Sequence, residues 1–244
     1  GAGRKMVDLL RTLSQMRVWR VSFYYVVVFG AYVALSVWLP KYYVDVFHLP
    51  LATAALLTAL FIFPASLLRP LGGWLSDRFG ARRMMYGVFM LMSVALFFLA
   101  APEGHIVFYV PKHINATGQV STLEYVMGPA LFTFLTFMVG CGMGIGKAAV
   151  YKYIPEYFPK DVGAVGGLVG LLGALGGFAL PPLFAYTLKW TGIPQTTFAI
   201  LLVLTLTCLA WLHIVVWRIL HRASPQLSDQ FDEKSKPAIL DAHS

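Results

Sequence analysis

Arg69 is the residue whose chemistry constrains the function of this chain most. It lies in the stretch LATAALLTALFIFPASLLRPLGGWLSDRFG, where the nearest other charged residues are Asp45 before it and Asp77 after it. A charged Arg at the centre of a bilayer costs at least about 2.5–3.5 kcal/mol, so such a residue faces protein, water or an anion and marks a binding site or a pathway. The alternative is an Arg whose side chain extends to the nearer membrane interface. The sequence favours an anion-binding role.

Lys147 is a second basic residue inside an apolar stretch, GCGMGIGKAAVYKY. The glycines before it do not form a nucleotide-binding loop. That motif needs Gly five positions before the last Gly, where this chain has Cys141, and Ser or Thr after the Lys, where it has Ala148. Buried lysines change their pKa readily. Two interpretations therefore remain: Lys147 binds and releases a proton as the protein works, or its ammonium extends to the cytoplasmic interface near Tyr153.

Other groupings that carry chemistry are not found in the sequence. The 6 His residues are scattered among loops, helix ends and the tail, with no metal-ligand spacing and no Ser/His/Asp grouping. Cys141 and Cys208 lie in apolar segments, which indicates neither a disulfide framework nor a metal site. The net charge is +8, but the basic residues lie between apolar stretches rather than on one polar face. We therefore expect no enzyme activity, no metal, no cofactor and no nucleic-acid partner.

The apolar stretches that hold these residues are long enough to cross a membrane. Only 12% of the 244 residues are charged, against about 25% in a soluble domain. A spanning helix needs about 20 mainly apolar residues, and six stretches qualify: about 18–46, 51–75, 84–101, 127–153, 162–188 and 196–220. The sequence predicts an all-α polytopic membrane protein with six transmembrane helices, in contact with lipid.

Three segments have features of their own. The first stretch contains Pro40 and is expected to be interrupted there. The fifth, GAVGGLVGLLGALGGFALPP, is rich in Gly, and small residues let transmembrane helices approach closely, so we expect it to pack against a neighbour. The segment 102–126 is expected to be a long polar loop.

The distribution of Lys and Arg predicts the orientation. With both termini in the cytoplasm, as six spans allow, most of the 19 Lys and Arg residues lie on the cytoplasmic side. The opposite side then has Lys41, Lys112 and Lys189, and Arg69 and Lys147 lie within the membrane. This asymmetry follows the positive-inside rule.

The loop after the second stretch reads GWLSDRFGARR. It resembles the G-x-L-x-D-R-x-G-R-[KR] signature of the major facilitator superfamily, which joins the second and third helices of each six-helix half and acts there as a conformational switch. The matching residues are Gly73, Asp77, Arg78, Gly80 and Arg82. Gly80 suits a tight turn, and Asp77 at a helix end suits contacts with basic partners that break and form again. The alternative is an ordinary basic cytoplasmic loop.

Three further segments narrow the resemblance. LLRPLGGWLSDRFG, GIGKAAVYKYIPEYFP and GGLVGLLGALGGFALP lie on three different spans, in the order found in the nitrate/nitrite porter family. Apart from its tail and the residues before the first span, the chain resembles the C-terminal six-helix half of such a porter. The Gly-rich span is similar to the nitrate-signature helix of that family.

The resemblance implies a binding site for nitrate or nitrite. Arg69 matches the family's substrate arginine, whose planar fork of donors suits a planar oxyanion better than an ammonium does. Tyr25 matches a tyrosine that presents its hydroxyl to the anion. Tyr151 stands where some members have a Phe that packs on the substrate, and its hydroxyl changes the polarity of the site. Gly170 belongs to the close-packed glycine helix beside the site.

Lys147 departs from part of this family. Some members carry Asn in the corresponding segment, whereas GIGKAAVYK is similar to the branch proposed to couple nitrate to protons. The resemblance therefore implies proton coupling through Lys147. Symport and exchange, and nitrate and nitrite, are not distinguished by the sequence.

Six spans make half of a typical twelve-helix transporter, which implies a second half as partner. This could be a separate chain or a second copy of this chain, or the sequence is a truncation. We expect a cytoplasmic linker over residues 1–17, a six-helix half-domain over 18–220 and a disordered cytoplasmic tail over 221–244, in a bacterial-type cytoplasmic (inner) membrane. Two alternative functions stay open: transport of another small anion such as a carboxylate, and a membrane scaffold that does not transport.

Overall fold

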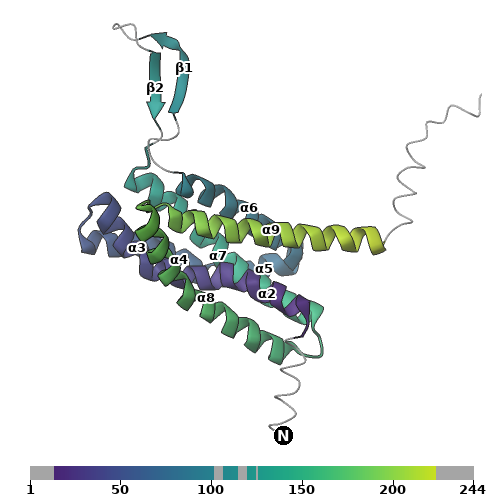
Figure 1. Ribbon diagram of the computed structural model, residues 1–244. Helices are drawn as coiled ribbons and strands as arrows, with labels where there is room; N and C mark the ends of the chain where they lie inside the picture. Colours follow the sequence, from purple (N-terminus) through teal and green to yellow (C-terminus); the bar gives the residue numbers. More distant parts are fainter. Residues whose placement is uncertain (1–13, 102–106, 115–119, 125, 224–244) are drawn as a thin grey trace, which may run out of the picture.

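The structure is a computed structural model that describes residues 14–101, 107–114, 120–124 and 126–223. The expected linker and tail lie largely outside these residues, since the first helix begins at Met16 and the last ends at Ala223. Within the described part, long helices pack side by side into a bundle, and a two-stranded hairpin projects from it (Figure 1).

The six predicted spans are confirmed. The first comprises α2 (Met16–Tyr25), the π-helix η1 (Val26–Gly30) and α3 (Ala31–Phe47). The second comprises α4 (Leu51–Leu67) and α5 (Arg69–Phe79), which meet at a bend of 42°. The remaining spans are α6 (Ala81–Ala100), α7 (Pro129–Tyr157), α8 (Val162–Thr191) and α9 (Thr196–Ala223). Five of the six spans are single helices that are long and apolar enough to cross a membrane, and the bent pair α4–α5 forms the sixth.

The prediction that Pro40 interrupts the first span is wrong. Helix α3 continues through it, and the irregularity lies ten residues earlier, at η1. A transmembrane helix tolerates Pro because neighbouring helices, Ser and Thr side chains and local adjustments of the helix satisfy the backbone groups that Pro leaves free. A π-turn adds a residue to one turn and often lies at a functional site. Here it directly follows Tyr25.

The segment expected to be a polar loop contains regular structure. Strands β1 (Val107–Ile114) and β2 (Val120–Glu124) pair in antiparallel fashion, with Val107 opposite Glu124. The stretch IVFYV, rich in β-branched and aromatic residues, is typical of a strand and was the available signal. This hairpin joins α6 to α7 and leaves the six-helix arrangement unchanged.

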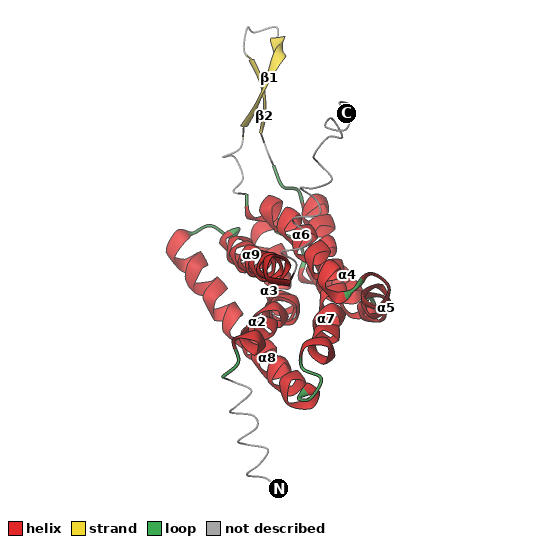
Figure 2. Ribbon diagram, turned by 90° about the vertical axis from the view of Figure 1, so that its right-hand side faces the viewer, coloured by secondary structure: helices red, strands yellow, loops and turns green. Residues whose placement is uncertain are grey.

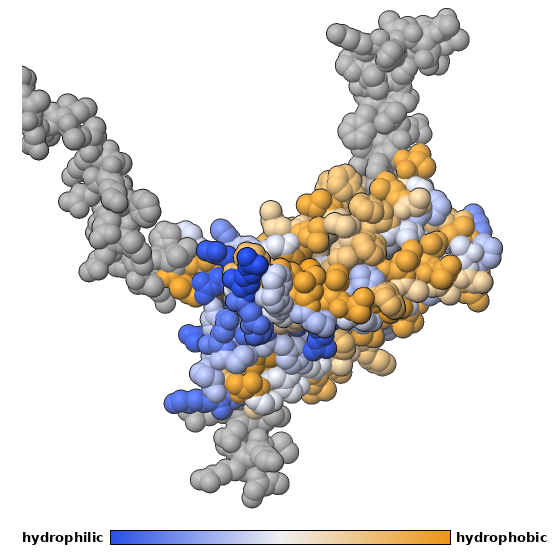
Figure 3. Space-filling model, turned by 180° about the vertical axis from the view of Figure 1, so that it is seen from behind, coloured by the Kyte–Doolittle hydropathy of each residue, from blue (hydrophilic) through white to orange (hydrophobic). Residues whose placement is uncertain are grey.

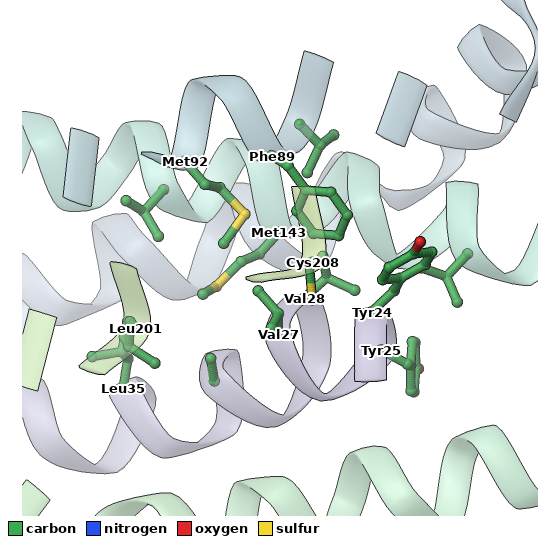
Figure 4. Packing of buried hydrophobic residues seen from close by; sticks show 14 of the residues in the cluster. Tyr24, Tyr25, Val27, Val28, Leu35, Phe89, Met92, Met143, Leu201 and Cys208 are labelled. Atoms are coloured by element: carbon green, nitrogen blue, oxygen red, sulfur yellow. The ribbon is translucent and has the colours of Figure 1, made fainter. Parts of the chain in front are cut away.

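Helix α7 lies at the centre of the bundle, packed against α4, α5 and α6, with α9 on the other side of α6. Figure 2 shows the helices in this grouping, with α8 beside α2. The core between α2, η1, α6, α7 and α9 contains Tyr24, Val28, Phe89, Met143 and Cys208, all buried (Figure 4). Buried side chains therefore fill the space between α2 and η1 on one side and α6, α7 and α9 on the other.

The predicted close packing of the Gly-rich helix is confirmed. A Cβ at Gly30 of η1 would lie 2.7 Å from the carbonyl oxygen of Gly173 in α8, and a Cβ at Gly176 would lie 2.7 Å from Val26. At Gly30 the two backbones meet directly, and at Gly176 the side chain of Val26 fills the space. The glycines bring α8 against the first span just beside Tyr25.

Hydrophobic side chains cover the flanks of the bundle, and hydrophilic ones gather toward the end from which α9 leaves it (Figure 3). Many large apolar side chains are exposed on these flanks, among them Phe63, Phe178 and Trp190. In water such a surface would aggregate. It suits contact with lipid and with other transmembrane helices.

Candidate substrate site

The bend in the second span positions Arg69. Leu68 separates the two helices, Arg69 begins α5, and Pro70 occupies its first turn. Pro has no backbone N–H, so the Ser66 carbonyl has no partner four residues ahead and the helix breaks where α4 ends. The guanidinium of Arg69 is carried at the start of a helix, where an anion is also favoured by the backbone dipoles.

Arg69 lies over the ring of Tyr151, with 5.5 Å between its guanidinium carbon and the ring centroid. Its side chain is otherwise exposed. The ion pairs among the described residues are Lys41–Asp45 and Lys152–Asp77, so no described carboxylate neutralises Arg69. A planar cation held on one side by an aromatic ring keeps its donors available to an oxyanion on the other side.

The four residues expected to bind the substrate lie together, although they come from four helices. The rings of Tyr25 in α2 and Tyr151 in α7 meet edge-on, with centroids 5.1 Å apart. Gly170 in α8 lies against the Tyr151 hydroxyl, which a Cβ at that position would approach to 3.2 Å. Tyr25 is buried and Tyr151 half-buried, so the Tyr151 ring beneath the Arg69 guanidinium rests against the ring of Tyr25.

Lys147 lies deeper in the bundle. The residue is only 4% exposed, its Nζ donates a hydrogen bond to the Ala65 carbonyl at 3.1 Å, and the ammonium lies 3.2 Å from the centroid of the Tyr32 ring. This geometry excludes the alternative in which Lys147 extends to the interface near Tyr153. Among the described residues, no carboxylate forms an ion pair with it.

Sequence reasoning missed two polar residues beside this lysine. The hydroxyl of Tyr32 in α3 lies 3.0 Å from the hydroxyl of Ser66 in α4. Tyr32 follows Tyr25 by seven residues, and Ser66 precedes Arg69 by three, spacings that in a regular helix place two residues near one face. That spacing was the available signal.

The loop between α5 and α6 has the geometry expected of its turn. Gly80 has φ +87°, a conformation that side chains rarely adopt, and it ends α5 and starts α6. Asp77 forms an ion pair with Lys152 of α7, so its basic partner comes from another helix. Arg82 donates a hydrogen bond to the Tyr157 hydroxyl at 2.5 Å. Two side chains beside this turn thus bind to the C-terminal part of α7.

The other two predicted loop residues make local or no contacts. Arg78 lies over the rings of Trp74 and Phe79, at 5.5 and 5.6 Å. A Cβ at Gly73 would meet nothing within 4 Å, whereas one at Gly72 would lie 2.7 Å from the backbone of Ile145 in α7. Gly72 is therefore the glycine that this packing requires.

Metal ligation has no support in the described part of the chain, where no group of three or more His, Cys, Asp and Glu side chains could hold an ion. The Nδ1 of His213 lies 3.3 Å from the Tyr86 hydroxyl. The chemistry of the site is therefore that of two cations, aromatic rings and hydroxyls.

Comparison with known proteins gives this geometry a context. The family description "Major Facilitator Superfamily" matches residues 21–241. The chain belongs to this superfamily. Two solved structures share its fold: the crystal structure of tetrameric PepTSo2 (TM-score 0.62, 14% identity, 81% of this chain and 40% of that one) and the inward-open xylose transporter XylE from E. coli (TM-score 0.59, 17% identity, 88% and 53%). The expected fold is confirmed, and the chain is a multi-pass membrane protein.

Two curated relatives show which kind of protein within the superfamily the chain is similar to. The chain is 61% identical over 234 residues to the "Probable nitrate/nitrite antiporter NarK1" of Thermus thermophilus, covering 96% of this chain and 52% of that protein. It is 33% identical over 200 residues to the "Nitrite extrusion protein" of Bacillus subtilis, covering 82% and 44%. The chain thus spans about half the length of these relatives. The resemblance to nitrate/nitrite porters is confirmed.

Proposed function

We propose that this chain is the C-terminal half of a transporter that moves nitrate, nitrite or both across the membrane by alternating access. The observation that carries the proposal is the guanidinium of Arg69, which lies over Tyr151 and has no carboxylate partner among the described residues. A planar fork of donors matches a planar oxyanion. Tyr25, Tyr151 and Gly170 form the wall of the same site.

A second six-helix half completes the site. In this superfamily's architecture two halves rock about a site between them near the membrane midplane. Arg69 is exposed on the bundle, so an anion bound to it would meet water on its other side unless a second half covers it. Co-purification of this chain with a second six-helix unit supports the proposal. Robust nitrate uptake by liposomes that hold only monomers of this chain would contradict it.

The names of the relatives support the substrate, and a competition assay tests it. Vesicles containing the assembled transporter should take up labelled nitrate or nitrite, and an excess of either unlabelled anion should compete. Chloride should compete weakly, because a spherical ion cannot accept two parallel hydrogen bonds from the planar fork of Arg69. Preferential competition by formate would favour the carboxylate alternative. If no anion is transported and loss of Arg69 is silent, the chain is a scaffold.

Proton coupling belongs to the same proposal. Lys147 is buried, forms no ion pair with a described carboxylate, and lies on α7, which packs against the helix that carries Arg69. Replacing it by Gln should abolish the pH dependence of nitrate transport. A pH profile unchanged in Lys147→Gln would remove Lys147 from the coupling.

The proposed location is a cytoplasmic (inner) membrane with both termini inside. The hydrophilic end of the bundle (Figure 3) and the positive-inside pattern support this orientation. An impermeant thiol reagent should label Lys160→Cys only from the cytoplasmic side and Lys189→Cys only from the opposite side. Both positions are exposed. Labelling of the two from the reverse sides would overturn the orientation.

A further inference from the structure

The bend of the second span is held by contacts from two other helices. Helix α7 approaches α4 so closely that a Cβ at Gly144 would lie 2.8 Å from the carbonyl oxygen of Pro64 and 3.1 Å from that of Ala65. Gly140, one turn earlier, is equally close to the backbone of Phe61. The last turns of α4 therefore rest directly on the backbone of α7, without intervening side chains.

Lys147 binds at the end of this contact. It follows Gly144 by three residues, and its ammonium donates to the Ala65 carbonyl in the last turn of α4. Carbonyl groups at the C-terminal end of a helix carry partial negative charge, and a cation placed there stabilises the helix end. Lys147 thus binds the last turn of α4 at Ala65, four residues before Arg69.

Tyr32 closes the arrangement from α3. Its ring lies beneath the ammonium of Lys147, 3.2 Å from centroid to Nζ, and its hydroxyl meets Ser66 at 3.0 Å. The bend is therefore held from both sides, by Lys147 at Ala65 and by Tyr32 at Ser66. The titratable and charged groups that face the ammonium are Tyr32 of α3 and Arg69 of α5.

We propose that Lys147 is a positioning residue for Arg69: by binding the end of α4 it sets the α4–α5 bend, and the bend directs the guanidinium over Tyr151 toward the anion. This role rests on the proposed function, because Arg69 is taken as the ligand. It is separate from proton coupling, since it requires the ammonium and the carbonyl but no titration. Lys147 then acts on the anion only through Arg69.

A double-mutant cycle tests this dependence, with labelled nitrate binding to the assembled transporter as the readout. Loss of one charge-assisted hydrogen bond in Lys147→Met should weaken binding about tenfold, and Lys147→Arg, which keeps the charge and the donors, should recover most of it. In the Arg69→Lys background, Lys147→Met should add less than about threefold, because residues that act through one another are not additive.

Additive losses in the cycle would overturn the positioning role and leave the proposed site intact. Wild-type binding by Arg69→Lys alone would instead overturn the site, and the positioning role with it. One more variant, Tyr32→Phe, keeps the test valid if Lys147→Met fails to fold. Tyr32→Phe keeps the ring under the ammonium and removes only the hydroxyl contact with Ser66, so the protein should fold. It should weaken nitrate binding a few-fold, and this effect should vanish in Arg69→Lys. If Tyr32→Phe weakens binding equally in both backgrounds, the bend does not act through Arg69.

Discussion

Replacing Arg69 by Lys keeps one positive charge and removes the planar fork. In the structure this side chain has the Tyr151 ring on one side and no described carboxylate on the other, so its donors are free for the anion. A guanidinium gives an oxyanion two parallel hydrogen bonds, whereas an ammonium gives one that is well directed. Losing one charge-assisted bond of about 1.5–3 kcal/mol corresponds to about a 10- to 150-fold weaker Kd.

The assay is equilibrium binding of labelled nitrate to the purified, assembled transporter, followed by uptake in vesicles. Arg69→Gln, which also removes the charge, should bind more weakly than Arg69→Lys. Arg218→Lys provides the matched control, since Arg218 is an exposed arginine near the end of α9 with no part in the site. Its variant should bind as the wild type does.

Two results would refute the reasoning. A wild-type Kd in Arg69→Lys would mean that the fork does not contact the anion. An equal loss in Arg69→Lys and Arg218→Lys would mean that the protein responds to any change at an arginine, through its fold or its surface charge. A preserved thermal unfolding midpoint in both variants separates these outcomes from misfolding.

Three further predictions concern the packing around the site and the ion pair beside the α5–α6 turn. Tyr151→Ala removes the ring under the guanidinium and should weaken nitrate binding by about 0.5–2 kcal/mol, while Tyr151→Phe, which keeps the ring, should bind almost normally; equal losses would place the effect on the hydroxyl. Gly30→Ala forces a Cβ to within 2.7 Å of a carbonyl oxygen of α8 and should destabilise the fold by about 1–3 kcal/mol in detergent melting, whereas Gly87→Ala, with open space around it, should not; equal melting would contradict the close helix contact. Asp77→Asn should change the free energy of unfolding by less than about 1 kcal/mol, because both partners of its ion pair are substantially exposed (58% and 41%). The same variant should slow transport. Exchanging the charges of Asp77 and Lys152 should restore the transport rate if the pair acts as a switch.

The spans could be predicted from the sequence because their signal is local. A run of about 20 apolar residues must cross the membrane whatever it packs against. The close contact of the Gly-rich helix is local in the same sense, since small residues in a membrane helix have few other uses. The site residues Tyr25, Tyr151 and Gly170 were different: nothing in their spacing joins α2, α7 and α8, and only the family resemblance brought them together.

The missed features depend on contacts between segments far apart in the chain. The π-turn at Val26–Gly30 accompanies the contact of Gly30 with α8, more than 140 residues later. The importance of Gly72 over Gly73 follows from the backbone of Ile145. The bend at Leu68 could have been predicted from the sequence, because Pro70 removes a backbone donor in a run that already contains Pro64. The partner of Lys147 could not be predicted, since every residue has a backbone carbonyl and the sequence does not indicate which one the ammonium binds.

The charges of this half limit how the anion is released. Arg69 and a protonated Lys147 together carry two positive charges, with no described carboxylate to offset them. One monovalent anion neutralises only one of these, so a site in this state holds an anion strongly and releases it only against a replacement, which is exchange. If Lys147 gives up its proton, one anion balances one cation, and release requires no replacement, which is symport with a proton. Under the proposed function, the protonation of Lys147, whose partners are the Ala65 carbonyl and the Tyr32 ring, would then distinguish exchange from symport.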